Sequence, residues 1–288
     1  MLELYPPVKS AGEDETVTDL QSVFDDLAAE SRFIDQMVDD LDPSQWATPT
    51  PAPQWTIADQ VAHLTFIFWL AKTAAADPAT FQLVASKAAN GFDAAVNAAL
   101  ADFRGEPAAM LERWRTERAA CVAALAAVPP SEVVPWLVRP LPASILACAG
   151  IMETFAHGQD IADALDVHRE ATDRLKHLVG FAILVRDFGY EARGLTPPAE
   201  EFRFEITAPS GELWAFGPED AAQRVSGPAE DFCLLVTRRR HRDDLAVTAV
   251  GKEADRWLDI AQAYRGPAGA GRAAGQFDAG VASVAGAG

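Results

Sequence analysis

The spacing of apolar residues changes near Glu201 in this 288-residue chain, and the change limits the fold more than any other feature of the sequence. From Val17 to about residue 193, apolar side chains recur mostly every three or four residues, which is the spacing of amphipathic helices. After that the period becomes two, because Phe202, Phe204 and Ile206 alternate with polar residues as in a strand with one buried face. We therefore predict an α+β fold, with a helical N-terminal part and a smaller C-terminal part that contains a sheet.

The N-terminal part contains long amphipathic segments separated by helix-breaking residues. The predicted helices cover residues 17–42, 57–76, 92–128 and 143–165, and Gly105-Glu106-Pro107 marks a candidate interruption of the third. Prolines at residues 49, 51 and 53 cannot continue a helix, and Thr56 with Asp59 three residues later has the pattern of a helix N-terminus. Four such helices predict a four-helix bundle.

The C-terminal part mixes the two periods. The pattern predicts a helix at 169–193, a hairpin of strands 202–207 and 213–216, helices at roughly 228–240 and 252–264, and a strand at 245–250. The expected division is a mobile leader at 1–16, the bundle at 17–168, an α+β domain at 169–265 and a disordered, Gly- and Ala-rich tail at 266–288.

The charge balance disfavours nucleic acid as a partner. The chain has 24 Lys and Arg residues against 42 Asp and Glu residues, a formal net charge of −18, whereas phosphate binding needs clustered positive charge. The one dense basic run, residues 238–242 with the sequence RRRHR, is followed by two aspartates. We interpret this run as a solvated helix end and expect a small-molecule substrate instead.

The cysteines and the apolar segments indicate a cytoplasmic protein that does not enter a membrane. Cys121, Cys148 and Cys233 are widely spaced in apolar surroundings, which is typical of buried free thiols in a reducing compartment. The start of the chain has no secretory pattern, and the longest apolar stretch, residues 61–76, is too short to span a bilayer. Both a monomer and a homodimer agree with this composition.

Two histidines lie inside predicted helices beside apolar neighbours, where helix bundles build internal sites. Glu153 and His157 are four residues apart and share one helical face, and His63 on a second helix could supply a third ligand. Two histidines and a carboxylate leave coordination positions open, as at a catalytic divalent-metal site. Zn²⁺ suits these ligands best, and Fe²⁺, Ni²⁺ and Co²⁺ remain alternatives. The spacing alone also allows a chance Glu–His pair and an ordinary core histidine.

Asp160 lies three residues after His157, on nearly the same helical face. We predict that it is a catalytic-site residue, an acceptor that orients an imidazole or a metal-bound water. The alternative is a solvated acid.

Two motifs in these helices resemble a known family. The first is W-x-x-x-D-x-x-x-H-L, from Trp55 to Leu64, and the second is E-x-x-x-H-x-x-D-I-A-D-A-L, from Glu153 to Leu165. Together they resemble the DinB-like superfamily that includes mycothiol-dependent maleylpyruvate isomerase, and more narrowly an actinobacterial subfamily of metal-binding proteins. The resemblance implies that His63, Glu153 and His157 bind the metal, that mycothiol is a cofactor, and that the C-terminal domain is sterol-carrier-like.

The resemblance implies a metal- and thiol-dependent transferase or isomerase, or a hydrolase, acting on an electrophilic small molecule, with a place in secondary metabolism. This sequence departs from the isomerase because no arginine lies between Arg32 and Arg104 to hold a dicarboxylate, and only Lys72 and Lys87 could do so there. The alternative is a non-catalytic, metal-braced protein that binds a small molecule or lipid. A DNA-binding regulator is disfavoured by the acidic composition.

Overall fold

The computed structural model describes residues 13–88, 100–137 and 139–277, and the chain divides into two compact units. One unit consists of Met1–Thr48 and Trp55–Thr154, the other of Pro49–Gln54 and Phe155–Gly288. The division falls within helix α6 (Ala143–Leu165), whereas we expected the bundle to end at residue 168. Sequence signals mark where a helix ends, but the extent of a compact unit depends on packing between distant segments.

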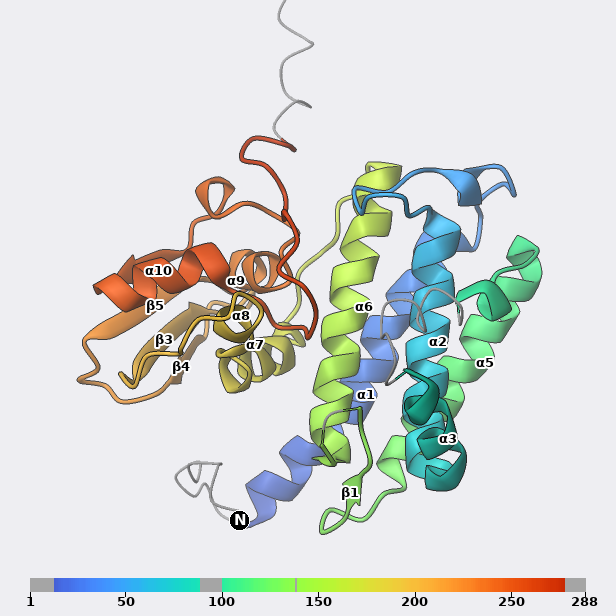
Figure 1. Ribbon diagram of the computed structural model, residues 1–288, viewed down its shortest axis with the longest axis horizontal. Coiled ribbons are helices and arrows are strands. Elements are labelled where there is room, and N and C mark those ends of the chain that lie inside the picture. Colours follow the sequence, from blue (N-terminus) through green and yellow to red (C-terminus); the bar gives the residue numbers. More distant parts are fainter. Residues whose placement is uncertain (1–12, 89–99, 138, 278–288) are drawn as a thin grey trace, which may run out of the picture. The chain divides into compact units, whose positions relative to one another are not determined.

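Long helices dominate the first unit, and Figure 1 shows them side by side. They are α1 (Glu13–Val38), α2 (Ile57–Ala76), α5 (Pro107–Ala126) and the first half of α6, joined by the short helices η1 (Gln45–Ala47) and α3 (Pro78–Ala88) and by strands β1 (Val133–Val134) and β2 (Leu141–Pro142). The predicted helices 57–76 and 143–165 are confirmed at both ends. Helix α1 begins four residues before Val17, and residues 1–12 of the predicted leader lie outside the described residues.

Helix α3 was not predicted, although it begins two residues after the end of α2. Proline lacks an N–H group, but the first residue of a helix needs none, so Pro78 can end one helix and begin the next. Pro107 begins α5 in the same way. The predicted start of a helix at residue 92 lies outside the described residues.

The start of α2 is fixed by a capping box. The Asp59 backbone N–H donates to the Thr56 hydroxyl at 3.3 Å, and the Thr56 backbone N–H donates to Asp59 Oδ2 at 2.9 Å. Arg104 also donates to Asp59, at 2.6 Å. This confirms the predicted N-terminus and fixes the register of every side chain that follows on α2.

An aromatic pair lies at the centre of the first unit. Trp114 of α5 is fully buried, and its ring meets Phe68 of α2 edge-on at a centroid distance of 5.0 Å. The Trp114 indole N–H donates to Asp35 of α1 at 2.7 Å, so its polar edge is also satisfied. One side chain thereby joins three helices.

The second unit contains a sheet with the strand order β4-β3-β5-β6. Its elements are α7 (Leu175–Leu184), α8 (Phe188–Glu191), β3 (Phe202–Thr207), β4 (Leu213–Phe216), β5 (Gln223–Pro228), α9 (Ala229–Val236), η2 (Arg242–Asp244), β6 (Thr248–Val250) and α10 (Lys252–Ile260). The predicted hairpin is confirmed by the antiparallel pairing of β3 with β4. Strand β3 also pairs in parallel with β5, which was not predicted because residues 223–228 (QRVSGP) alternate poorly.

Helices α9 and α10 cover the same face of this sheet. The ring of Phe204 on β3 contacts Phe232 of α9 and Trp257 of α10, with centroid distances of 6.0 and 5.6 Å. Both helices are shorter than predicted, because the chain turns at Arg238, which has a φ of 59°, and leaves the helix at Ala261. The α+β class is confirmed by this mixture of helices and sheet.

Part of the predicted tail packs on the second unit. Arg272 binds Asp160, the Gly275 N–H donates to Asp244 at 2.8 Å, and Arg240 lies 3.7 Å from the Phe277 ring centroid. Composition indicated disorder here, but isolated anchor residues among the glycines and alanines make these contacts. Residues 278–288 lie outside the described part of the chain.

Across the ranges that the structure describes, we find no helix with both the length and the apolar character needed to cross a bilayer.

Candidate metal centre

His63 lies nearly two turns into α2, behind the capping box that begins this helix. Its side chain is 12% exposed, and its ring lies 5.2 Å from the ring of Trp55, centroid to centroid. Trp55 is therefore one wall of the site, placed by the connector just before α2. The imidazole is therefore largely, but not completely, shielded from water.

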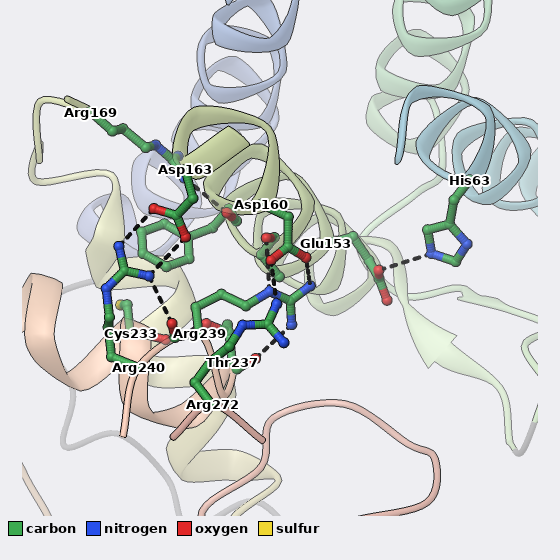
Figure 2. Close-up of polar contacts among 12 residues, drawn as sticks. His63, Glu153, Asp160, Asp163, Arg169, Cys233, Thr237, Arg239, Arg240 and Arg272 are labelled. Carbon is green, nitrogen blue, oxygen red and sulfur yellow. Dashed lines mark hydrogen bonds and ion pairs between the residues drawn. The ribbon is translucent and has the colours of Figure 1, made fainter. Parts of the chain in front are cut away.

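The structure brings the three predicted ligands together. One donor atom from each of His63, Glu153 and His157 lies within 4.8 Å of the other two, and all three residues are partly buried. Glu153 and His157 lie one turn apart on α6, and Figure 2 shows the Glu153 carboxylate directed at the His63 ring. The predicted constellation therefore exists as one cluster.

The spacing within the cluster fits a divalent ion. His63 Nε2 and Glu153 Oε2 lie 3.4 Å apart, longer than the ~2.9 Å of a good N–H···O hydrogen bond. Two atoms that each bind one tetrahedral ion at roughly 2.0–2.2 Å are about 3.4 Å from each other. Two imidazole nitrogens and a carboxylate oxygen within 4.8 Å of one another suit Zn²⁺ or a similar ion and leave coordination positions open.

Asp160 is held by two guanidinium groups. Its side chain is completely buried, with Arg239 at 2.9 Å from Oδ2 and Arg272 at 2.5 Å from Oδ1 (Figure 2). Arg239 also donates to the carbonyl of Ala156 at 3.0 Å, next to His157 in the sequence. The interpretation of Asp160 as a solvated acid is therefore wrong, and its predicted role in the site remains a prediction.

The interpretation of residues 238–242 as a solvated helix end is also wrong for the middle of the run. The side chains of Arg239 and Arg240 are only 12% and 16% exposed, and Arg240 binds both oxygens of Asp163, at 2.7 and 2.8 Å. The run faces aspartates on α6, which sequence spacing could not reveal. The one signal of these ion pairs in the sequence was the run of five adjacent basic residues in an acidic chain.

The Lys72 side chain is already paired with a carboxylate. Its ammonium group donates to Glu117 of α5 at 2.5 Å. The lysine that the sequence offered for a dicarboxylate is therefore engaged by a partner within its own unit, and the side chain of Lys87 lies outside the described residues.

Two of the three cysteines are buried core thiols. None of the three cysteines is in a disulfide bond, and Cys121 and Cys233 are buried. Burial raises the pKa of the Cys121 thiol to about 12 and raises that of Cys233 well above its usual range. At neutral pH both are protonated, as expected for core thiols.

The sequence matches two known protein families and two proteins of similar sequence. Residues 27–162 match the family described as mycothiol maleylpyruvate isomerase N-terminal domain, and residues 198–250 match a family described as wyosine base formation. Two proteins from different strains of Mycobacterium tuberculosis, uncharacterized proteins MT0041 and Rv0036c, are each 48% identical over 252 residues. The aligned region covers 86% of this chain and 96% of each relative.

Solved structures with a similar fold include the mycothiol-dependent maleylpyruvate isomerase and a mutant of it. The TM-score is 0.52 for both, with 14% and 16% sequence identity, and each alignment covers 80% of this chain and 92% of the other. At this identity the likeness concerns the fold.

Proposed function

The chain belongs to the DinB-like superfamily that includes the mycothiol-dependent maleylpyruvate isomerase, and from this membership we propose that it is a divalent-metal-dependent enzyme using a low-molecular-weight thiol. The observation that carries the proposal is the cluster of His63, Glu153 and His157, whose donor atoms lie within 4.8 Å of one another. Its N-terminal part would be a DinB-like four-helix bundle and its C-terminal part a sterol-carrier-like domain.

The three ligands would hold one ion, with Zn²⁺ favoured by the two imidazoles. A bound Zn²⁺ ion acidifies a coordinated thiol or water and polarises a carbonyl group. Glu153 lowers the net charge of the site, and Trp55 restricts how much water reaches His63. The thiol would be mycothiol, named in the matched family, and the compartment would be the cytoplasm, where such thiols stay reduced.

Asp160 would be a positioning residue in this enzyme. It fixes Arg239 and Arg272, and Arg239 also binds the carbonyl next to His157, so positive charge lies close to that ligand on α6. Such charge favours an anionic thiolate or carboxylate near His157.

The reaction would be thiol-dependent isomerisation or transfer, or hydrolysis, of an electrophilic small molecule. Because Lys72 is paired with Glu117, we propose an electrophile other than maleylpyruvate as the substrate. A role in secondary metabolism fits this broader substrate class.

Metal content tests the site. Elemental mass spectrometry should find about one divalent ion per wild-type chain and almost none in His63→Ala or His157→Ala. His168→Ala is the matched control, because His168 is exposed and lies outside the cluster. Full metal content in both cluster variants would refute the ligand set.

Turnover tests the chemistry. The zinc-loaded protein is incubated with mycothiol and a panel of electrophiles, including maleylpyruvate, beside metal-free protein and a reaction without thiol. Product that requires both metal and thiol supports the proposal. A protein that holds metal but turns over nothing, while binding an apolar ligand independently of metal, would instead be a metal-braced binding protein.

A further inference from the structure

A polar cavity with a strongly basic lining lies within the second unit. It has a volume of about 190 Å³ and lies among α9, α10 and the segment around residue 271. Its charged and titratable lining residues are Arg238, Arg240, His241, Arg242, Arg272 and Asp259. We call it the Arg238 pocket. None of the three candidate metal ligands lines it.

Most of these arginines already have carboxylate partners. Arg240 binds Asp163, Arg242 binds Asp255 at 2.6 Å and Asp259 at 2.8 Å, and Arg272 binds Asp160. These pairs hold the guanidinium groups in fixed positions, as preorganised anion sites require.

Arg238 differs from the other three arginines. In the described ranges no carboxylate lies within ion-pair distance of it, and its hydrogen bond to the Gly269 carbonyl is long, at 3.4 Å. Arg238 also has a left-handed backbone conformation, with a φ of 59°, at the end of α9. Its position is set by the chain reversal and not by a partner charge.

Two buried N–H groups in the lining have no acceptor among the described residues. They are Nε of Arg238 and Nε of Arg272, and the Arg272 side chain is only 9% exposed. Buried donors are rarely left unsatisfied, because their desolvation is not compensated. Both groups belong to residues that line the same cavity, so one acceptor-rich ligand could satisfy both.

Arg193 places a second positive charge near Arg238. Arg193 donates to two backbone carbonyls, Gly189 at 2.9 Å and Ile260 at 3.1 Å. Burial lowers the pKa of Arg193, and the positive charge of Arg238 lowers it further. Two cations close to each other, in a chain with a net charge of −18, are a local exception that an anion would stabilise.

We propose that the Arg238 pocket binds the phosphate group of a small molecule. Phosphate offers several acceptor oxygens and a double negative charge, which match two guanidinium groups with unsatisfied N–H donors. The cavity is smaller than the roughly 300–1,000 Å³ of sites that enclose a whole drug-sized ligand. It therefore accommodates free phosphate or the phosphate end of a larger metabolite.

Calorimetric titration tests the proposal, with inorganic phosphate and glycerol 3-phosphate as probes and sodium chloride used to keep the ionic strength constant. Wild-type protein should bind phosphate saturably, and Arg238→Gln should weaken binding about tenfold or more, the usual effect of losing a charge-assisted hydrogen bond. Tighter binding of glycerol 3-phosphate than of inorganic phosphate would identify a phosphorylated metabolite, and the reverse would identify free phosphate.

Matched variants separate the pocket from general charge effects and from the metal site. Arg256→Gln removes the same charge from an arginine that is 45% exposed on α10, and it should leave phosphate binding unchanged. His157→Ala should also leave it unchanged, because His157 does not line the pocket. Circular dichroism checks that Arg238→Gln is folded, and Arg238→Lys, which keeps the charge but lacks Nε, should bind more weakly than wild type.

The proposal is overturned if wild-type protein shows no saturable phosphate binding, or if Arg238→Gln binds as well as Arg256→Gln. Loss of binding in His157→Ala would assign the phosphate to the metal centre and would also overturn it. Succinate binding more tightly than phosphate would do the same, because the ligand class would then be a dicarboxylate.

Discussion

Replacing Asp160 with asparagine should strongly destabilise the second unit. The carboxylate is completely buried and binds Arg239 and Arg272, whose side chains are only 12% and 9% exposed. Asparagine keeps the volume but removes the charge and places an N–H₂ group against one guanidinium. Breaking a buried ion pair by removing one partner costs about 3–5 kcal/mol, because a charge remains buried without compensation.

Urea unfolding followed by circular dichroism and tryptophan fluorescence measures this cost. With an m-value of about 2 kcal/mol/M, a loss of 3–5 kcal/mol corresponds to a fall in midpoint of about 2 M for the transition of the second unit. Trp214 and Trp257 report on that unit.

Asp255→Asn is the matched control. Asp255 binds Arg242 at 2.6 Å, a distance like that between Asp160 and Arg272, but its side chain is 64% exposed. An exposed pair contributes roughly 0–1 kcal/mol, so this midpoint should move little. Equal effects of the two substitutions would refute the argument that burial makes the Asp160 cluster essential.

Three further outcomes follow from the structure. Glu153→Gln should lower zinc affinity at least about tenfold while the fold is kept, because it removes the charge of the ligand but little of its volume. Unchanged affinity in a competition assay with a chelator would count against Glu153 as a ligand. Thr56→Ala should lower the free energy of unfolding by about 1 kcal/mol, because the capping box at the start of α2 is lost; an unchanged urea midpoint would contradict this. At pH 8 iodoacetamide should modify Cys148, which is partly exposed, much faster than Cys121. The raised pKa of about 12 leaves a thiolate fraction of only about 10⁻⁴ at Cys121, and equal rates by mass spectrometry would show that this thiol is accessible.

The sequence predicted the elements whose signals are local. The signals that begin and end helix α2, the N-cap and Asp77-Pro78, lie in the sequence next to the helix itself. Helix α6 has a continuous apolar stripe, so both helices were placed correctly. The spacing of Glu153 and His157 is also a local property of one helix. His63 was named as a possible third ligand from its place on a second predicted helix and as a ligand through the family resemblance, and the cluster within 4.8 Å agrees with that assignment.

The features that the sequence could not reveal depend on distant partners. Strand β5 alternates weakly because it lies between β3 and β6, where pairing on both edges supports it without a strong pattern of its own. The burial of Arg239 and Arg240 depends on aspartates nearly eighty residues away on α6. No window of sequence contains both members of these pairs.

The pair of Asp160 and Arg272, 112 residues apart, also has a consequence for synthesis on the ribosome. Chains are made from the N-terminus, so α6 is complete well before Arg272 leaves the ribosomal tunnel. Until Arg272 emerges, Asp160 can pair only with Arg239, and only after α9 has formed. The other carboxylate oxygen of Asp160 still has no guanidinium partner. The second unit therefore acquires its full set of buried charges only after Arg272 has emerged, and chains truncated before residue 272 should be more sensitive to proteases than chains that contain it.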